Sequence, residues 1–502
     1  MSLLAVDIGS STCKAVVFAA TGQILAQHAS GYAPEFHRPA FAEMDPEKFW
    51  HAVCSSCRAV AEDLTDPVRA LCLSSHGETF VAVDSHGQPI TNAILNQDSR
   101  ATRESTRCEV VIGRERLFQI TGLFAHPMYP IPKILWLRKH EPEVFAATKS
   151  FVTLIGYLLQ KMGFPPYVDY SLASRFLAFD IRNRTWSDEV LCAVELDKAC
   201  LPVPVPAGTI AGRLNSETAA QFGVSAGTPV VLGGHDQPCG ALGVGVVGGG
   251  RVSDSMGTYE CLLAASDAPS LNDKALAACL NTYCHVVPDK FVTLAYFPSG
   301  IMVKWFHDLL YAEESRGGNS RVVADGIEAS HYAFLEADAP QGPTGLCITP
   351  HLIGTCNPEF NAQARGLIAG LQPGINRAHI YKGILEGLAC ELSIVTEVLA
   401  EAVGEFGDIY VYGGGTRSAL GLQLRAALTG RRLHVMHRQE AVCLGSAILA
   451  GVAIGEYESI GQALAGLLAE GALVAPDNAI TVSYRDQMRR YRYLRSAVMQ
   501  HA

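Results

Sequence analysis

A short pattern that occurs twice in this 502-residue sequence limits the folds open to it. The first copy runs from Leu4 to Val16 and the second from Arg251 to Leu263. Each has a β-rich run, an Asp, a Gly, a hydroxyl residue and a second β-rich run, which is typical of a hairpin with a polar turn. Two copies of one unit, in a chain too long for a single core, predict a duplicated domain.

Other segments indicate an α/β fold. Strand-like runs at Ala70 to Ser74 and Thr79 to Asp84 alternate with helical patterns such as Pro46 to Leu64. A further helix is predicted from Pro132 to His140, because its apolar residues share one face and it starts with Pro. Alternating strands and helices favour helices packed on sheets.

The boundary between the predicted domains falls in a glycine-dense stretch, Gly240 to Gly250, which follows a predicted strand from Pro229 to Leu232. Such a stretch is a good candidate for a domain junction. We therefore expect one domain at residues 1–246 and a second at 247–502.

Composition and charge narrow the function classes. The formal net charge is -10 and the pI is about 5.9, whereas nucleic-acid binders concentrate Lys and Arg. The start of the chain has no basic leader, and Asp7 interrupts its apolar run. The longest uncharged apolar run, Ala441 to Gly455, is too short to span a bilayer. We expect a cytoplasmic protein with no nucleic-acid or membrane partner.

The fifteen cysteines have no framework spacing, so we expect them to be reduced and mostly buried. Cys54 and Cys57 form a CxxC pair without a second pair. This isolated spacing does not favour a metal or redox site.

The first hairpin holds residues suited to phosphate. Gly9 lets backbone N–H groups point at an anion, and Lys14 adds positive charge. Three hydroxyl residues add donors: Ser10, Ser11 and Thr12. Asp7, beside bound phosphates, suits Mg²⁺ held directly or through water. An ordinary hairpin with a polar turn is the alternative.

The second hairpin offers similar donors at Gly257 and Thr258. Two such loops facing each other across a cleft would hold a polyphosphate from both sides. The pairing of the loops therefore favours phosphate binding over two unrelated turns.

Asp236 follows a buried strand and two glycines. Taken alone, the pattern favours a helix N-cap with Pro238 in the first turn. The functional interpretation places an acid at the carboxyl end of a strand, where clefts of open α/β sheets form. There Asp236 would accept the proton of an attacking hydroxyl, with Gln237 beside it.

Two glycine-rich segments need separate interpretation. A strand ending at Tyr412 leads into Gly413, Gly414, Gly415 and Ser418, and such a turn allows close approach of adenine or phosphate. A flexible strand-to-helix connection is the equal alternative.

The stretch from Gly243 to Gly248 matches GxGxxG, with Asp267 near the distance expected for a ribose-binding acid. A β-rich segment follows it instead of a helix. We therefore expect no dinucleotide site there.

Polar residues at predicted strand ends suit a polyol pocket, because each sugar hydroxyl requires a partner once it is desolvated. Gly77 and Glu78 follow one strand, and Asp98 follows another apolar stretch. Surface loops are the alternative.

Together these segments resemble the FGGY family of carbohydrate kinases, from Leu3 to about Tyr457. The run from Met128 to His140 fits the family's first signature throughout. A second signature is nearly met between Gly366 and Glu386, and it departs at Gly383, where a small Ala or Ser is usual.

The resemblance implies a fold of duplicated ribonuclease-H-like, actin-like domains, with a nucleotide cleft between a sugar-binding N-terminal domain and a nucleotide-binding C-terminal domain. It implies ATP and Mg²⁺ as cofactors, Asp7 as the Mg²⁺-associated acid and Asp236 as the catalytic base. The implied nucleotide contacts are Ser10, Ser11, Thr12, Lys14, Gly257, Thr258, Gly300, Gly414, Gly415 and Ser418. The implied sugar contacts are Gly77, Glu78, Asp98, Asp236 and Gln237.

Within the family, residues 93–100, 133–145 and 413–430 are most similar to xylulose kinases, so phosphorylation of D-xylulose to xylulose 5-phosphate is the first expectation. The pocket departs from that branch: its usual Met-His pair falls on Gly77 and Glu78, and a usual Trp falls on Asn96. Glu78 is similar to the glycerol kinase branch, but the Arg that accompanies it there is replaced by Gly77.

Alternatives remain open. They are a kinase for another pentulose, a hexulose or a polyol, of the ribulose, glycerol or erythritol type, and a non-catalytic actin-like sensor of sugar or nucleotide. The presence of both Asp7 and Asp236 favours an enzyme. The sequence does not decide the oligomeric state, for which a homodimer is one option.

Overall fold

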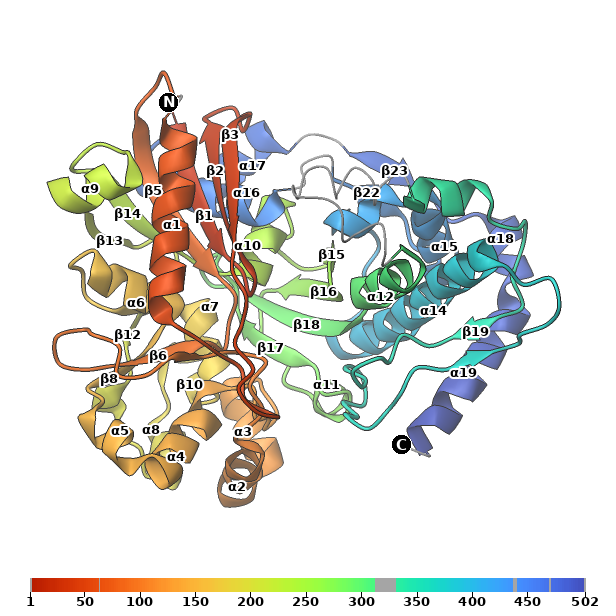
Figure 1. The fold of residues 1–502 in the computed structure, drawn as a ribbon, viewed down its shortest axis with the longest axis horizontal. Helices are drawn as coiled ribbons and strands as arrows, with labels where there is room; N and C mark the ends of the chain where they lie inside the picture. The colour runs from red at the N-terminus through yellow and green to blue at the C-terminus, as the bar shows by residue number, and fades with distance from the viewer. Residues whose placement is uncertain (1, 63, 312–330, 437–439, 469–470, 501–502) are drawn as a thin grey trace.

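The computed structural model describes residues 2–62, 64–311, 331–436, 440–468 and 471–500. Two lobes, each built on a mixed sheet, lie side by side in Figure 1. The first sheet has the order β13-β14-β5-β1-β2-β3. Its strands are β1 (Ser2–Ile8), β2 (Thr12–Ala19), β3 (Ile24–Gly31), β5 (Val68–Ser75), β13 (Ile210–Arg213) and β14 (Pro229–His235).

The second sheet has the order β17-β18-β16-β15-β21-β22-β23. Its strands are β15 (Val252–Met256), β16 (Tyr259–Ser266), β17 (Asn281–Cys284), β18 (Phe291–Pro298), β21 (Ile409–Tyr412), β22 (Leu433–Val435) and β23 (Ala472–Val474).

The second sheet repeats the first strand by strand. In each, an antiparallel meander (β1-β2-β3 or β15-β16-β18) continues into two parallel strands (β5 and β14, or β21 and β22). An antiparallel edge strand follows, β13 or β23. β17 is added beyond β18. The duplicated α/β fold predicted from the two hairpins is therefore confirmed.

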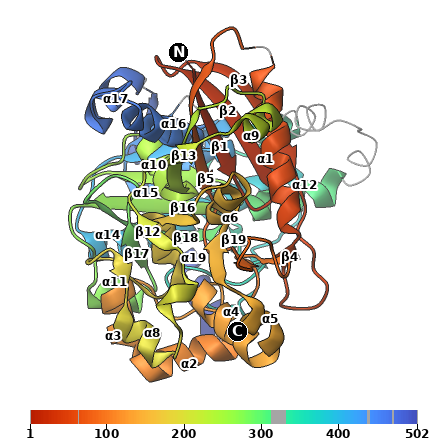
Figure 2. The same cartoon turned by 90° about the vertical axis from the view of Figure 1, so that its left-hand side faces the viewer.

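Helices cover both faces of the sheets. In Figure 2, α1 and α16 lie on opposite sides of the first sheet. The helices are α1 (Pro46–Ala61), α2 (Thr102–Ile112), α3 (Arg114–Thr121), α4 (Pro130–His140), α5 (Pro142–Ala147), α6 (Leu154–Lys161), α7 (Tyr170–Ala173), η1 (Ser174–Phe176), α8 (Asp188–Ala193), η2 (Lys198–Cys200), α9 (Ser216–Phe222), α10 (Asp236–Gly243), α11 (Asp273–Ala277), α12 (Gly300–Tyr311), α14 (Arg377–Val403), η4 (Gly414–Arg417), α15 (Ala419–Thr429), α16 (Ala441–Ala453), α17 (Ile460–Leu467), α18 (Asn478–Ser483) and α19 (Arg485–Gln500).

Four smaller sheets surround this frame. They pair β4 (Glu43–Met44), β7 (Ala93–Ile94), β6 (Phe80–Val83) and β8 (Ser150–Thr153); β10 (Phe179–Asp180) with β11 (Thr185–Trp186); β9 (Tyr167–Asp169) with β12 (Val203–Val205); and β19 (Cys347–Ile348) with β20 (Ile368–Ala369).

Local sequence explains the clearest helix. In α1, Asp45 is the N-cap and accepts a hydrogen bond from the N–H of Glu47, and Pro46 occupies the first turn. Phe49, Val53 and other apolar residues at helical spacing are buried against the outer face of the first sheet. The observed helix is three residues shorter than the predicted one, and α4 starts two residues earlier than predicted.

Two helices between the sheets join the halves of the chain. Helix α16, from the second half, packs on the first sheet in a cluster with Leu3, Ala5 and Cys72. Helix α10, from the first half, places Ala241 against the second sheet, as does Val244, the residue after the helix. The division of the chain at residues 246 and 247 stays a prediction.

The remaining sequence expectations have clear outcomes. The GxGxxG stretch begins at the last residue of α10 and leads into β15, so it lacks the helix that a dinucleotide site requires. Residues 441–453 form the largely buried helix α16, and no helix among the described residues is long and apolar enough to cross a membrane.

Candidate active site

The first hairpin is held by its backbone. The N–H of Gly9 donates to the carbonyl of Thr12 at 2.9 Å, and Tyr32 donates from its hydroxyl to the carbonyl of Gly9 at 2.5 Å. The side chains of Ser10 and Ser11 make no hydrogen bond within the described part of the chain. The turn therefore has the free donors that the sequence predicted.

Asp7 and Lys14 are paired across this hairpin and share the face of the sheet on which α16 packs. The Ser74 hydroxyl donates to Asp7 Oδ1 at 3.1 Å. Burial raises the pKa of Asp7 to about 6, although Ser74 and Lys14 counter the effect. Lys14 itself contacts Glu440, with Nζ to Oε distances of 2.7 and 3.0 Å. Its charge is therefore already paired in this structure.

Asp236 is the first residue of α10, at the carboxyl end of β14. The cap predicted for Asp236 belongs to the preceding residue, because Nδ1 of His235 accepts from the N–H of Gln237 at 3.2 Å. Asp236 Oδ1 accepts from the same N–H at 2.7 Å.

The surroundings of Asp236 disfavour the charged form of its carboxyl group. Burial and the charge of Asp7 raise the pKa of Asp236 well above its usual range, Glu78 adds to the rise, and Arg175 opposes it. The carboxyl group therefore lies within electrostatic reach of Asp7, Glu78 and Arg175.

A chain of hydrogen bonds that sequence reasoning missed fixes the end of β14. The Ser171 hydroxyl donates to Asp169 Oδ2 at 2.5 Å and accepts from the N–H of His235 at 2.9 Å. Burial raises the pKa of Asp169 to about 6. Asp169 and Ser171 come from β9 and α7, and no local pattern links them to position 235.

His76 connects the end of β1 with Thr79. Its Nδ1 lies 2.9 Å from the carbonyl of Ile8, and its Nε2 lies 2.8 Å from the hydroxyl of Thr79. Thr79 also accepts from the N–H of Asn96. Burial lowers the pKa of His76, which favours the neutral ring. Through Thr79, the ring links β1 to the backbone of Asn96.

The amide oxygens of Asn96 and Gln237 are buried and have no hydrogen-bonding partner among the described residues. Buried polar atoms normally have partners, so these two are candidates for ligand contacts.

Asp98 does not lie free for a sugar. Its carboxylate accepts from the N–H of Ala42 at 2.8 Å and from the guanidinium of Arg100 at 2.7 to 3.0 Å. The side chain is buried, and these partners come from its own loop and from residue 42. The Asp98 carboxylate therefore already has protein partners, and its contact with a sugar stays a prediction.

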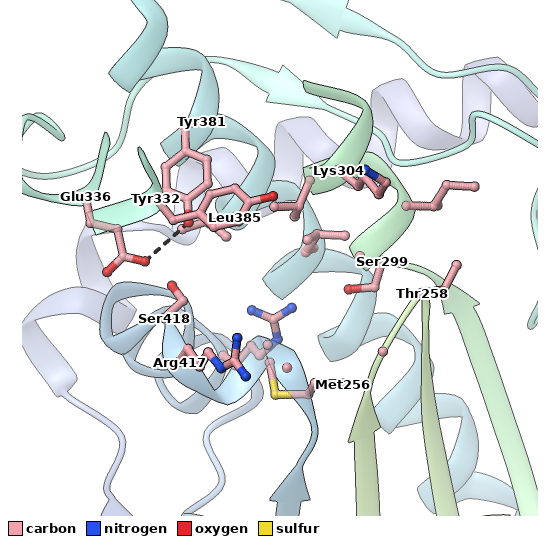
Figure 3. Close-up of a pocket in the computed structure, with 18 of the residues that line it drawn as sticks. Met256, Thr258, Ser299, Lys304, Tyr332, Glu336, Tyr381, Leu385, Arg417 and Ser418 are labelled. Atoms are coloured by element: carbon pink, nitrogen blue, oxygen red, sulfur yellow. Dashed lines mark hydrogen bonds between the residues drawn. The ribbon is translucent and has the colours of Figure 1, made fainter. Parts of the chain in front are cut away.

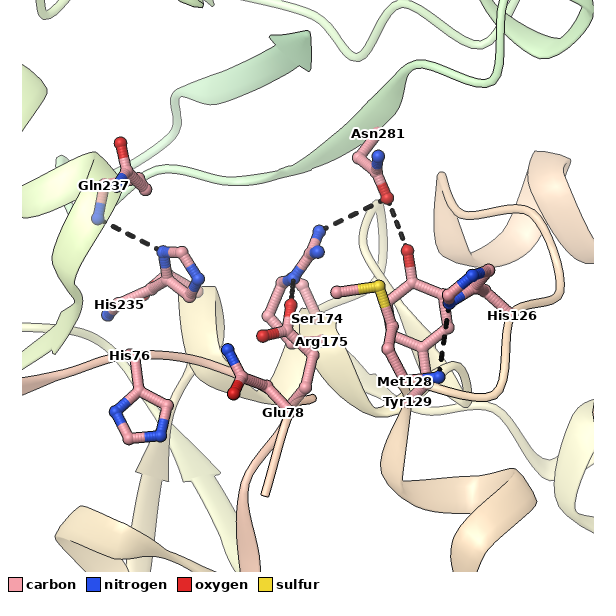
Figure 4. Close-up of polar contacts among 12 residues, drawn as sticks. His76, Glu78, His126, Met128, Tyr129, Ser174, Arg175, His235, Gln237 and Asn281 are labelled. Carbon is pink, nitrogen blue, oxygen red and sulfur yellow. Dashed lines mark hydrogen bonds and ion pairs between the residues drawn. The ribbon is translucent and has the colours of Figure 1, made fainter. Parts of the chain in front are cut away.

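Glu78 lies in a buried polar cluster with Arg175, Tyr129 and Asn281 (Figure 4). Arg175 Nε donates to Glu78 Oε1 at 2.6 Å, and the Tyr129 hydroxyl donates to Asn281 Oδ1 at 2.5 Å. Tyr129 stands within the family signature, but neither Arg175 nor Asn281 had a local signal.

The six nucleotide contacts predicted in the second half line one pocket of about 490 Å³ (Figure 3). They are Gly257, Thr258, Gly300, Gly414, Gly415 and Ser418. Apolar and aromatic walls come from α12 and α14 and include Val303, Leu385 and Tyr381. This volume and lining are typical of small-ligand sites.

Several pocket residues also have structural roles. The Ser418 hydroxyl caps α15 by accepting from the N–H of Gly421 at 2.9 Å. A side chain at Gly300 would overlap the backbone of Gly257, so the two loops touch directly. Arg425 also lines the pocket. Its Nε and Nη2 atoms donate to the Glu260 carboxylate at 2.8 and 2.7 Å.

The two hairpins differ at their acids. Asp254 shares the face of β15 with Val252 and Met256, which pack in a cluster with α14. Asp7 shares a face of β1 with Leu3 and Ala5, and this face packs against α16. Asp254 is therefore not the counterpart of Asp7, although both precede a glycine in the sequence.

The cysteines and acids form no metal cage in the described ranges, where no group of three or more His, Cys, Asp or Glu side chains could hold an ion. Cys54 and Cys57 are free. The two cysteines lie about one turn apart on α1, and Cys57 is buried in the core.

Comparisons with known proteins agree with this geometry. The model of the FGGY carbohydrate kinase N-terminal domain matches residues 2–243, and that of the C-terminal domain matches residues 252–454. The chain is 26% identical over 481 residues to a xylulose kinase of Bacillus subtilis (94% of this chain and 92% of that protein) and 26% identical over 493 residues to a gluconokinase of Bacillus licheniformis (97% and 94%).

Solved structures show the same fold. A ligand-bound xylulose kinase from Lactobacillus acidophilus superposes with a TM-score of 0.88 at 21% identity, covering 99% of this chain and 98% of that one. Plasmodium falciparum glycerol kinase with ADP gives 0.82 at 20% identity, covering 98% of each. With both family domains matched in order and the duplicated sheets in place, the chain belongs to the FGGY family of carbohydrate kinases and is a sugar kinase.

Proposed function

We propose that this kinase transfers the γ-phosphoryl group of MgATP to a hydroxyl of a small ketose, D-xylulose first, with Asp236 as general base. The observation that carries the proposal is the position of Asp236 at the carboxyl end of β14, within electrostatic reach of Asp7 and of the Arg175–Glu78 pair. An acid there can accept the proton of a hydroxyl that attacks a phosphate held at the first hairpin.

The nucleotide would occupy the pocket between α12, α14 and η4, with its phosphates toward Gly257 and Thr258 and the first hairpin. Backbone N–H groups and hydroxyls at Ser10, Ser11 and Thr12 would bind phosphate oxygens. Lys14 would contribute its charge only on exchanging Glu440 for phosphate.

The donor set fits Mg²⁺ held mainly by nucleotide. Asp7 has a carboxylate whose ionisation is disfavoured by burial, and a bound cation would relieve that cost. Mg²⁺ usually takes one or two carboxylates together with phosphates and water, and needs no all-protein cage. When bound, the ion supplies charge neutralisation; Asp7 orients it, and Asp236 receives the proton.

Xylulose is the first choice because xylulose kinases are among the most similar relatives. Gluconokinase and autoinducer-2 kinase relatives have 26% and 27% identity, so sequence similarity does not separate the substrates.

The test is ATP consumption with D-xylulose, D-ribulose, glycerol and D-gluconate, for the parent and Asp236→Asn. We expect the substitution to lower kcat by roughly 10²-fold or more with at least one substrate, because it removes the base. The control is Asp188→Asn, on an exposed side chain of α8. If Asp236→Asn keeps turnover within about tenfold of the parent, another group accepts the proton.

A further inference from the structure

The strand that leads to Asp236 ends irregularly. β14 pairs with β5 in parallel, and the register shifts between Leu232 and Gly234, so Gly233 is an extra residue on β14. A β-bulge of this kind bends a strand and changes the direction of the residues that follow it. The position of Asp236, the first residue after β14, therefore depends on the contacts that hold this bulge.

Gly234 has a backbone conformation that favours glycine. Its φ is +132°, in a region that residues with a side chain rarely adopt. A Cβ added there would lie 2.7 Å from Ser171 Oγ, 2.8 Å from Asp169 Oδ2 and 2.8 Å from Val286 Cγ1. The hydroxyl of Ser171 and the carboxylate of Asp169 therefore lie directly against the backbone of the bulge.

The Ser171 hydroxyl bridges the bulge and the Asp169 carboxylate. It accepts from the N–H of His235 at 2.9 Å and donates to Asp169 Oδ2 at 2.5 Å. A hydroxyl can donate and accept at the same time, whereas an ionised carboxylate only accepts. Ser171 therefore links the residue before Asp236 to an acceptor at the end of β9.

Asp169 is held in place by its own turn. It caps α7, where its carboxylate accepts from the N–H groups of Ser171 at 2.7 Å and Leu172 at 3.3 Å. Asp169 and Ser171 are 1% and 0% exposed. Burying a carboxyl group is costly, and an exposed Asp would cap a helix equally well. The cap alone therefore does not explain the burial of Asp169, whereas its contact with β14 does.

The bulge also sets the position of Asp236 relative to Asp7. Across the first sheet, Asp7 pairs with Ser74 and Ser74 pairs with Gly234. The Ser74 hydroxyl also donates to Asp7 Oδ1 at 3.1 Å. Asp7 and Gly234 thus lie in one row of the sheet, and Asp236 follows two residues later. A change at the bulge would therefore move Asp236 relative to the first hairpin.

His235 passes this constraint to the start of α10. Its N–H is held by Ser171, and its ring Nδ1 accepts from the N–H of Gln237 at 3.2 Å, as Figure 4 shows. Asp236 lies between these two anchored residues. A general base must lie within hydrogen-bonding reach of the hydroxyl that it deprotonates, and a displacement of about 1 Å can lower the rate about 10²-fold.

We propose that Ser171 and Asp169 are positioning residues for phosphoryl transfer. The Ser171 hydroxyl, oriented by Asp169, holds the end of β14 in the conformation that places Asp236 at the acceptor hydroxyl. The proposal rests on the proposed role of Asp236 as general base, and it adds two residues that act through His235 instead of through contact with a substrate.

The first measurement is steady-state kinetics of the parent, Ser171→Ala and Ser171→Thr with MgATP and the acceptor that the parent uses best. Ser171→Ala removes the bridge, so we expect kcat to fall about tenfold or more while KM for ATP stays within about twofold. Ser171→Thr keeps a hydroxyl that can donate and accept, and we expect its kcat to lie within about threefold of the parent.

The second measurement is amide hydrogen exchange of the segment from Gly233 to Gln237, which reports the hold on β14 without any turnover. Exchange should be faster in Ser171→Ala and close to that of the parent in Ser171→Thr, because the His235 N–H keeps its acceptor in the latter. If the added methyl group of Thr itself loosens the strand end, exchange rises and kcat must fall with it.

Ser187→Ala is the matched control. Ser187 is also a buried serine that caps a short helix, since its hydroxyl accepts from the N–H of Val190 at 3.2 Å. Its helix, α8, lies apart from β14 in Figure 1. We expect Ser187→Ala to lower Tm as a lost cap does and to leave kcat within about twofold of the parent.

A kcat like that of the parent in Ser171→Ala, despite faster exchange at the end of β14, would overturn the inference. So would an equal loss of kcat in Ser187→Ala, or a low kcat in Ser171→Thr with exchange unchanged. Failure of the proposed function has a different signature, because Asp236→Asn would then keep turnover within about tenfold of the parent. If Asp236→Asn is strongly impaired and Ser171→Ala is not, the base stands and the positioning role alone is wrong.

Discussion

At the residue scale, Gly77 has a larger influence than its size suggests. The absence of a side chain at this position admits both the His235 ring and the Arg175 stem. His235 caps the helix that starts with Asp236, and Arg175 pairs with Glu78. The space at Gly77 is therefore filled by one side chain that caps α10 and by another that pairs with Glu78.

Gly77→Ala tests this arrangement. The added Cβ would displace His235 or Arg175, so we expect KM for the sugar to rise about tenfold or more while KM for ATP stays within about twofold. Steady-state kinetics with each substrate varied in turn measures the split. The control is Gly249→Ala, where a Cβ meets nothing within 4 Å. Equal changes in both KM values would show that the glycine serves general packing instead.

At the element scale, the long helix α14 anchors the C-terminal helix α19 through a buried acid. Glu391 Oε1 accepts from Tyr491 at 2.6 Å and from Arg495 Nε at 2.8 Å, and His351 Nε2 lies 3.2 Å away. Burial alone would raise the pKa of Glu391, but Arg495 and the hydrogen bonds outweigh it and lower the pKa to about 2.

Because the pKa in the folded chain lies below the unfolded value, ionised Glu391 stabilises the fold at pH values above about 4.5, and the contribution is lost as pH falls toward 2. Its size at neutral pH is roughly 3 kcal/mol. We expect Glu391→Gln to lower Tm at pH 7, and the difference from the parent to narrow below pH 4.5.

Thermal unfolding of both proteins from pH 7 to pH 3.5 checks the sign of this effect. Glu401→Gln, on an exposed residue of the same helix, is the control. A difference that widens on acidification would contradict the assigned charge state.

At the scale of the whole molecule, the two lobes are tied by the crossing of α10 and α16. A Cβ at Gly243 would overlap the carbonyl oxygen of Ala441, and one at Gly445 would overlap that of Cys239. The backbones of the two helices are therefore in direct contact. Each helix also packs on the sheet of the other half, so neither lobe has a complete core without its partner.

Gly445→Ala should push the two helices apart and lower the free energy of unfolding by about 1–3 kcal/mol. Because both lobes contribute to the nucleotide and acceptor sites, kcat should fall as well. Calorimetric melting and turnover measure the two effects. Gly466→Ala, in α17, adds a Cβ that meets nothing within 4 Å and is the control. An unchanged Tm for Gly445→Ala would mean that α10 and α16 can move apart without loss of stability.

Local patterns predicted much of this protein. The hairpins at residues 4–16 and 251–263, the strand before Asp236 and the glycine turn at 413–415 depend on neighbours in sequence, so periodicity and turn chemistry identify them. The family resemblance grouped six residues that are dispersed in the sequence, and the structure places all six along one pocket.

Tertiary contacts decided the rest. Lys14 meets Glu440 from the other end of the chain, Asp98 is held by Ala42 and Arg100, and Arg175 reaches Glu78 from a separate turn. The sequence by itself determined which residues stand at strand ends and turns, because those positions follow from local backbone geometry. The tertiary structure decided which of these residues keep free polar atoms for a ligand. Their partners come together only when the two halves pack, and a buried polar or charged group pairs with the groups that the fold places beside it.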